Sequence, residues 1–384
     1  MPSATRLTTS APPDARAEAL LASFERAGYA RIAPAILQPA EPFLDLSGED
    51  IRRRMYLTAD PQGLELCLRP DLTIPVSRHY LASPAAGKPQ GFCYLGPVFR
   101  HRDAGASEFL QAGIESFARA DTAAADAEML ALGLDATAHY GLEAADIRMG
   151  DVALFSALID ALDLAPGWKR RLIKDFNHKT SLAHDLDRLT IAASPARPEY
   201  QGVLAALAGS DPKAAHALVT DLLSIAGITA VGGRSVGEIA DRFLEQAALG
   251  AQTSLPRETR TLIEKFLAIR GDPDEAAADL RAFARDANIA LDAALDLFES
   301  RTGFLAARGV DVGRVRFSTA FGRGLDYYTG FVFELHDPAA QAADQLVAGG
   351  RYDGLLTRLG SARAIAAVGF AVWIERLAAL RNRS

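Results

Sequence analysis

Three polar side chains, Arg100, Gln111 and Glu115, interrupt an apolar stretch typical of β-strands, "YLGPVFRHRDAGASEFLQAGIE". Because side chains alternate along a strand, Gln111 and Glu115 are predicted on one face about 13 Å apart, with Gly113 leaving open space between them. An arginine, an amide and a carboxylate around a floor with glycines could cradle a small ligand. The solvent-facing side of a hairpin is the alternative interpretation.

A second group of polar residues lies in "FGRGLDYYTGFVFE". Arg323 stands between two glycines, which lets a ligand or a backbone approach closely. Tyr327 and Tyr328 are expected to face different ways, so at least one hydroxyl points inward; a structural tyrosine pair in a strand is the alternative. In "AGGRYDGL", Arg351 and Tyr352 follow a Gly-Gly pair, a pattern more typical of a turn with a salt bridge. Together the segments offer arginines to an anion and a carboxylate with tyrosines to a donor, which suits a small zwitterion with a polar ring, among other ligands.

Composition narrows the class of protein. The chain has 384 residues, 49% of them hydrophobic and 23% charged, which is ordinary for a globular protein. Cys67 and Cys93 fit neither a disulfide framework nor a metal site, so no metal or cofactor is expected. The net charge of −7 disfavours a nucleic-acid partner. The N-terminus has no apolar signal segment and no stretch is apolar enough for a membrane helix, which predicts a cytoplasmic protein.

The elements that must position these residues fall into three regions. Strand-like segments at both ends enclose a mainly helical middle, which predicts an α+β fold built on an antiparallel sheet flanked by helices. We expect disorder in residues 1–12, one domain over 13–384, and a helical insertion within it over 165–300. A hairpin is predicted with its turn at Asp60 to Gly63, and a helix is predicted from Asp121 or Thr122 to near Gly141.

Taken in order, these segments resemble class II aminoacyl-tRNA synthetases, and histidyl-tRNA synthetase in particular. "YLGPVFR…EFLQAGIE" is similar to its motif 2, "GRGLDYYTGFVFE" and "AGGRYDGL" to its histidine-specific segments, and "VGFAVWIERL" to its motif 3. "RPDLTIP" is similar to the enzyme's R-P-E-G-T-A-P segment. The resemblance covers the whole chain except parts of the helical middle, and it implies the class II catalytic-type fold.

The same resemblance implies a set of histidine-binding residues. Asp71 and Thr73 would meet the amino group, with aspartate in place of the enzyme's glutamate. Around the carboxylate would lie Arg100, Gln111 and Arg323. Glu115 and Tyr328 would hold the imidazole, and Tyr327 and Tyr352 would line the pocket.

The nucleotide half of the enzyme's site is altered in this sequence. The motif 2 loop is shortened to "RHRDAGASEF", with Arg102 at the position of the enzyme's glutamate. Trp373 replaces the motif 3 glycine that gives room beside adenine, and an indole there would occupy most of the space for a purine. Arg376, which contacts phosphate in the enzyme, is kept and is unexplained by histidine binding. The eight residues after it leave no room for an anticodon-binding domain.

This combination is similar to the family of ATP phosphoribosyltransferase regulatory subunits, synthetase paralogues of histidine biosynthesis. The resemblance implies a chain that performs no chemistry, binds L-histidine for feedback regulation, and self-associates as a dimer. It also implies a hetero-octamer with the short-form catalytic subunit, which joins ATP to phosphoribosyl pyrophosphate in the pathway's first step.

Two other functions remain open from the sequence. A truncated synthetase-like enzyme that makes histidyl-adenylate is favoured by the retained Arg100, Arg323 and Arg376, and is opposed by Trp373 and the short loop. An accessory subunit of a nucleic-acid enzyme is disfavoured by the acidic balance of the chain and by its histidine-binding residues.

Overall fold

A computed structural model describes residues 15–47, 51–103, 105–176, 182, 186–187, 212–225, 257–340 and 345–380. The predicted disorder at 1–12 and much of the predicted helical insertion at 165–300 lie outside these residues.

The chain divides into two compact units, each described here by itself. Unit 1 comprises residues 1–155 and 266–384, and unit 2 comprises residues 156–265. The helices at 273–307 belong to unit 1, where they pack on each other and near the strand at 315–318. The single domain over 13–384 with a helical insertion at 165–300 stays a prediction. The helices that lie wholly or mostly in unit 2 are α6 (Val152–Ala161), α7 (Pro166–Asp175), α10 (Pro212–Ile225) and α12 (Arg257–Leu267).

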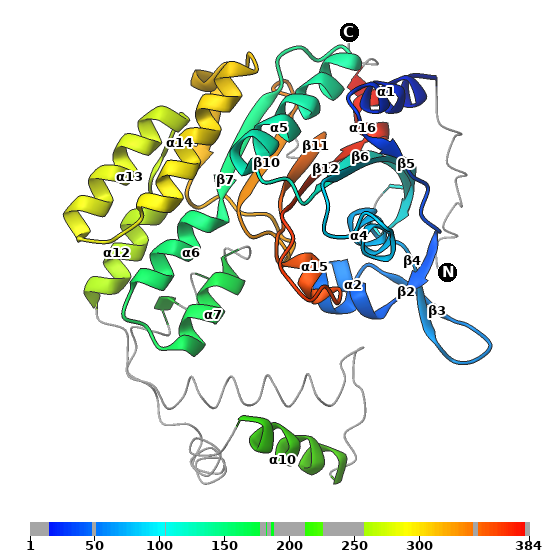
Figure 1. Ribbon diagram of the computed structural model, residues 1–384, viewed down its shortest axis with the longest axis horizontal. Helices are drawn as coiled ribbons and strands as arrows, with labels where there is room; N and C mark the ends of the chain where they lie inside the picture. Colours follow the sequence, from blue (N-terminus) through cyan, green and yellow to red (C-terminus); the bar gives the residue numbers. More distant parts are fainter. Residues whose placement is uncertain are drawn as a thin grey trace. The chain divides into compact units, whose positions relative to one another are not determined.

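The described residues of unit 1 form a nine-stranded sheet in the order β1-β5-β6-β12-β11-β10-β7-β9-β8 (Figure 1). Its strands are β1 (Ala30–Arg31), β5 (Gln90–Phe99), β6 (Glu108–Phe117), β7 (Asp146–Asp151), β8 (Arg270–Gly271), β9 (Val315–Ser318), β10 (Phe331–His336), β11 (Val347–Arg351) and β12 (Ala367–Trp373). The six strands from β5 to β7 in this order pair antiparallel, as predicted, while β1–β5 and β7–β9 pair parallel. The sheet is therefore mixed at its margins and antiparallel in the part that carries the predicted site.

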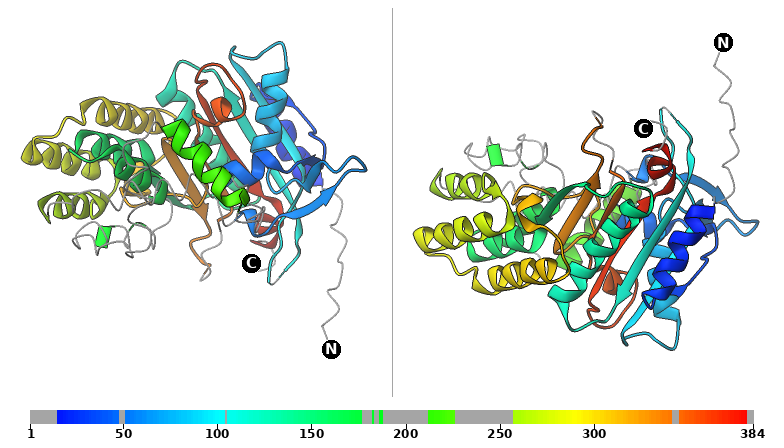
Figure 2. Two further views of the ribbon diagram at one scale, coloured as in Figure 1. Left: turned by 90° about the horizontal axis from the view of Figure 1, so that it is seen from below. Right: turned by 90° about the horizontal axis from the view of Figure 1, so that it is seen from above.

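Helices α1 (Ala15–Arg26) and α5 (Thr122–His139) cover one face of this sheet (Figure 2). Helix α5 approaches closely because its inner side is rich in small residues; a Cβ at Gly133 would come within 3.3 Å of the side chains of Phe333 and Val347. The other helices of unit 1 are α2 (Glu41–Leu46), α4 (Thr73–Ala82), α13 (Pro273–Ala287), α14 (Asp292–Ala307), η1 (Val312–Arg314), α15 (Leu355–Arg358) and α16 (Ile374–Ala379).

A small second sheet holds the predicted hairpin. Its order is β2 (Leu37–Pro39), β4 (Glu65–Leu68), β3 (Tyr56–Ala59), and all its pairs are antiparallel. The turn lies where the sequence placed it: Asp60 accepts hydrogen bonds from Gln62 and Leu64, and Gly63 has a φ of +85°. The helix predicted from Asp121 or Thr122 to near Gly141 is also confirmed, as α5.

None of the helices described is long and apolar enough to cross a membrane. In the same part of the chain, no three or more His, Cys, Asp or Glu side chains are grouped so that they could hold a metal ion.

Candidate functional site

A cavity of about 160 Å³ lies on the face of the sheet opposite α5. Phe333 and Val347 face α5, so the next residues, Glu334 and Ala348, face the other way. Both of these line the cavity, together with residues from β5, β6 and β12, the start of α4, and the loop before β10. An enclosed space of about 150 Å³ can hold a single aromatic ring, so the cavity suits one small ligand.

A row of small residues forms the centre of the sheet under this cavity. Gly113 on β6 pairs with Ala371 on β12, which pairs with Ala348 on β11. The sequence predicted open space above Gly113, but the phenol of Tyr94 fills it, since a Cβ at Gly113 would lie 2.4 Å from the Tyr94 hydroxyl. The prediction of empty space was wrong because the cross-strand neighbour, Tyr94, folds over the glycine.

Glu115 is 1% exposed and lies behind residues that line the cavity, to which it is hydrogen-bonded. It accepts hydrogen bonds from the hydroxyls of Thr73 (2.7 Å), Tyr94 (3.2 Å) and Tyr352. Burial raises the pKa of Glu115 to about 8, although these hydroxyls act to lower it. Because Gly369 faces its carboxylate, any larger residue there would collide with it. The pKa of Glu115 is therefore close enough to neutral pH for its carboxyl group to gain or lose a proton there.

Asp71 and Arg100 are a second pair of charged groups at the cavity. One oxygen of Asp71 accepts a hydrogen bond from the backbone of Ile74 at the start of α4 (3.1 Å), while the other, Oδ2, is buried without a hydrogen-bond partner. Burial raises the pKa of Asp71 against the lowering effects of that bond and of the Arg100 charge. Arg100 donates from Nε to the carbonyl of Pro70 (2.7 Å), which fixes its guanidinium beside Asp71. Such a buried acceptor needs an explanation, and a hydrogen bond from a bound ligand is one that its place at the cavity supports.

A chain of polar contacts extends from the cavity to the end of β10. Arg323 donates to the Tyr328 hydroxyl (2.5 Å) and to Glu334 (3.2 Å), and His336 lies 3.1 Å from the other oxygen of Glu334. Burial alone would raise the pKa of Glu334, but the hydrogen bond with His336 and the charge of Arg323 outweigh it and hold that pKa below its usual value. Glu334 is therefore an ionised anchor that orients Arg323.

The structure brings the predicted residues together. Eight of the nine line the cavity directly: Asp71, Thr73, Arg100, Gln111, Arg323, Tyr327, Tyr328 and Tyr352. The ninth is Glu115, which reaches the cavity through the hydroxyls that it binds. Gln111 is also 1% exposed, so the solvent-facing hairpin is excluded.

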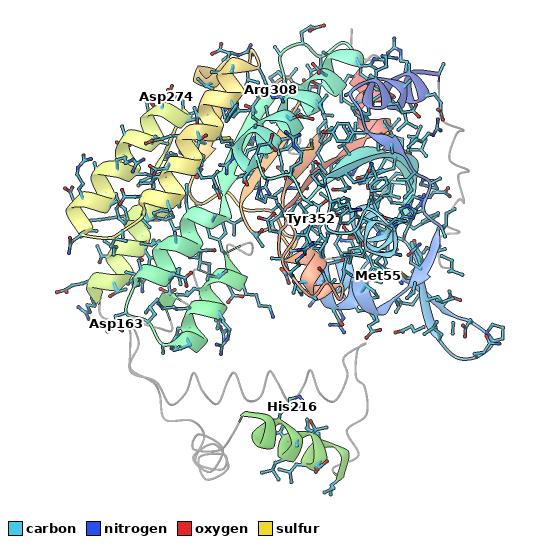
Figure 3. The ribbon with its side chains drawn as sticks, in the orientation of Figure 1. Met55, Asp163, His216, Asp274, Arg308 and Tyr352 are labelled. Atoms are coloured by element: carbon cyan, nitrogen blue, oxygen red, sulfur yellow. The ribbon has the colours of Figure 1, made fainter. Side chains whose placement is uncertain are left out.

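Tyr327 and Tyr328 do not face opposite ways, as a strand would require. Residues 319–330 precede β10 as turns and bends, and both rings line the cavity with their centroids 5.0 Å apart. Tyr352, labelled in Figure 3, follows β11 directly and packs edge-on against Tyr327 at 5.9 Å. The three tyrosines thus form one continuous wall.

Four further lining residues that carry a polar group in the side chain were not assigned a ligand-binding role from the sequence: Tyr94, Glu334, Gln345 and Trp373. Glu334 carried a usable signal, because it is an acidic residue at an alternating position of the otherwise apolar strand "FVFELH". Gln345 carried no such signal, since it lies outside any motif.

Arg351 takes the structural role that its pattern indicated. It turns away from the cavity toward α5 and forms ion pairs with Asp126 (2.6 Å) and Asp353 (2.9 Å). Asp126 also pairs with Arg301 (2.9 Å), which pairs with Asp151 (2.7 Å). We refer to Asp126, Asp151, Arg301 and Arg351 as the ion cluster.

The hairpin turn between β5 and β6 places no side chain on the cavity from its described residues other than Arg100. Arg100 closes the turn through a backbone hydrogen bond to Ser107 (2.8 Å). The guanidinium of Arg102 lies 3.8 Å from the ring centre of Phe109. Arg102 thus packs on the hairpin itself.

Comparisons with known proteins identify the family and the fold. The family model described as histidyl-tRNA synthetase matches residues 12–232 and 216–377. The fold is shared with a solved structure from Bacillus halodurans C, titled an ATP phosphoribosyltransferase regulatory subunit/histidyl-tRNA synthetase, with a TM-score of 0.64, 22% identity, and coverage of 95% of this chain and 77% of that one. A histidine–tRNA ligase subunit from Alicyclobacillus acidocaldarius gives a TM-score of 0.57 and 26% identity, covering 100% of this chain and 98% of the other.

The curated relatives are more similar in sequence. Proteins of Brucella canis and Brucella suis are 44% identical to this chain over 347 residues, which is 90% of this chain and 91% of each relative. Both relatives are named ATP phosphoribosyltransferase regulatory subunit. The predicted class II fold and the predicted family are confirmed: this chain belongs to the family of ATP phosphoribosyltransferase regulatory subunits.

Proposed function

We propose that this chain binds L-histidine in the cavity and thereby regulates the catalytic subunit of ATP phosphoribosyltransferase, the enzyme of the first step of histidine biosynthesis. The observation that carries the proposal is the buried, incompletely satisfied polar lining: Asp71 Oδ2 has no partner, and Glu115 has a pKa of about 8 because of burial. Such groups are costly in an empty cavity, and a ligand with complementary donors would offset that cost.

The polar groups suit the two ends of histidine. The amino group would donate to Asp71, and the carboxylate would lie among Arg100, Gln111 and Arg323, all of which line the cavity. Thr73 would also meet the amino group. The imidazole would meet the Tyr328 hydroxyl and, through the hydroxyls of Tyr94 and Tyr352, the carboxylate of Glu115. Glu115 would then act on the imidazole through these hydroxyls.

The proposed assembly follows the family. The chain would self-associate as a dimer and join a short-form catalytic subunit in a hetero-octamer in the cytoplasm, without a nucleic-acid partner. Feedback control requires that histidine bind one state of this assembly more tightly than another.

The alternative enzyme, which would make histidyl-adenylate, loses one of its supports. Arg376, kept from the nucleotide site of the synthetase, donates to the backbone carbonyl of Gln345 (2.6 Å) and lies over the ring of Trp373 at 5.2 Å. Its retention is therefore explained without a nucleotide. Histidine-dependent pyrophosphate exchange above background would favour the enzyme over the regulatory subunit.

The proposal is tested with the purified chain and a cognate short-form catalytic subunit. Mixing is expected to raise activity, and histidine is expected to inhibit the mixture. Glu115→Gln should weaken that inhibition by roughly ten- to hundredfold, because leaving a buried hydrogen-bond partner unsatisfied costs about 1–3 kcal/mol. Glu299→Gln, the same change at an exposed ion pair on α14, is the matched control.

Assembly of each variant is followed by analytical ultracentrifugation. If Glu115→Gln assembles and is inhibited at the wild-type histidine concentration, this cavity is not the sensor. If mixing changes neither mass nor activity, the partnership itself is refuted.

A further inference from the structure

One large residue in the wall of the cavity, Trp373, has no role among the proposed histidine contacts. Trp373 is the last residue of β12, is 4% exposed and lines the cavity. Gly369 and Ala371 share its face of the strand and also line the cavity, but both are small, whereas Trp373 carries an indole. Trp373 is therefore the bulky wall residue that β12 contributes on this face.

Trp373 is fixed from two sides. Its backbone N–H donates to the carbonyl of Leu346 (2.9 Å), which ties the end of β12 to the segment that enters β11. The guanidinium of Arg376 lies 5.2 Å from the ring centre and donates to the carbonyl of the adjacent Gln345 (2.6 Å). A cation over the indole face is an attractive contact. The ring is thus held between the cavity and a guanidinium that is itself anchored to the backbone.

The register places this indole beside the carboxylate end of the proposed ligand. Trp373 pairs directly with Gln111, which lies with Arg100 and Arg323 among the residues assigned to the carboxylate. Directly opposed side chains on an antiparallel pair have Cβ atoms about 5 Å apart. A group attached to the carboxylate would therefore run into the indole, whereas a free carboxylate would stop short of it.

We propose that Trp373, held by Arg376, is a specificity-determining residue that restricts the cavity to amino acids with a free carboxylate. Esters and peptides, which extend the ligand at that end, are excluded by size, whereas a primary amide of the same size loses only the charge. This inference rests on the proposed histidine binding and adds a residue and a size limit to it.

The test compares three probes by calorimetric titration: L-histidine, L-histidinamide and the dipeptide L-histidyl-glycine. Histidinamide has the size of histidine without the negative charge, so it measures the cost of losing the charge alone. Histidyl-glycine adds length. The wild-type chain should bind histidine best and histidyl-glycine worst.

Trp373→Ala should tighten histidyl-glycine binding by about tenfold or more relative to histidinamide, since a misfit of even one methylene in an apolar pocket is worth about 10- to 200-fold. Trp373→Leu should give a smaller gain in the same direction and keeps the site apolar if the alanine variant does not fold. Arg376→Met, which frees the ring without removing it, should give the smallest gain. Thermal unfolding of each variant checks its fold.

The outcomes separate the two proposals. If wild-type chain binds histidine and the Trp373 variants show the wild-type ratio of histidyl-glycine to histidinamide affinity, the role of Trp373 is overturned while histidine binding stands. If the wild-type chain binds none of the three probes, the proposed function fails, and the inference fails with it.

Discussion

Two buried groups of charges lie on opposite faces of the unit 1 sheet, and they differ in how completely their carboxylate oxygens are paired within the protein. In the ion cluster, Asp126 binds both Arg301 and Arg351, and Asp151 binds Arg301. Burial alone would lower the pKa of Arg301, but Asp151 and Asp126 outweigh it and leave that pKa above its usual value. In the cavity, burial raises the pKa of both Glu115 and Asp71, and Asp71 Oδ2 has no partner.

The difference separates a structural network from a binding site. The ion cluster joins α5, α14 and β11 with complementary charges, so it is complete without a ligand. The cavity carries acceptors and arginines that a zwitterion would complete. Burial and charge alone do not distinguish the two groups, whereas the satisfaction of each polar atom does.

The largest expected effect comes from the same acid-to-amide change made in both groups. Asp126→Asn leaves the buried Arg301 and Arg351 short of a counter-charge and should lower the free energy of unfolding by about 3–5 kcal/mol. Glu115→Gln should lower it far less, because its carboxyl is already disfavoured as an anion by burial. Urea unfolding at neutral pH measures both. Equal losses would contradict the distinction between the two groups.

The pH dependence of stability sharpens the contrast. The pKa of Glu115 is raised to about 8 in the folded chain by burial, above the value of about 4.3 expected when unfolded. The folded state therefore binds more protons across this range, and the contribution of Glu115 to stability is present below about pH 4 and lost as the pH rises to about 8.

Glu115→Gln removes that dependence. The unfolding free energy of the variant, relative to wild type, should therefore rise between about pH 5 and about pH 8. Urea unfolding across this range gives the difference at each pH. A constant difference would mean that Glu115 titrates as an ordinary surface carboxyl, and the ligand-free cavity would not be desolvated as described.

Single hydroxyls should have the smallest effects. Tyr352→Phe removes a donor to Glu115, and Tyr328→Phe removes the acceptor for Arg323. Each should weaken histidine binding by about two- to tenfold, because a hydrogen bond is worth about 0.5–1.5 kcal/mol and the ring is kept. Tyr80→Phe, a buried hydroxyl that binds the Lys88 carbonyl away from the cavity, is the control. Unchanged affinity in both cavity variants would remove these hydroxyls from the proposed contacts.

Much of the fold and site could be predicted because the information is local. Alternation placed Gln111 and Glu115 on one face, and the observed pairing of Tyr94 with Gly113 agrees with that prediction. Asp60 to Gly63 specified a turn through a side-chain acceptor and a glycine with positive φ. The sequence motifs then identified the other predicted lining residues, which come from distant segments of the chain.

The rest depended on packing between distant segments. That Tyr94 would cover Gly113, and that Glu115 would lie behind three hydroxyls, requires the positions of Thr73 and Tyr352. The partner of Arg376 is a backbone carbonyl 31 residues away, which no pattern in the sequence indicates. Arg351 and Tyr352 are adjacent, yet one enters the ion cluster and the other the cavity.

Calorimetric titration of the wild-type chain with L-histidine across pH tests whether the cavity binds histidine. In the proposed complex, Glu115 and the imidazole together carry one proton that titrates in this pH range. Affinity should therefore fall below about pH 6.5, where free histidine must lose a proton, and above about pH 8, where the empty cavity must gain one. We expect one site per chain and a maximum of the histidine affinity between these pH values. In the Glu115→Gln variant, the fall in affinity at high pH should be absent. No saturable heat from L-histidine, or the same pH profile in wild type and Glu115→Gln, would contradict it.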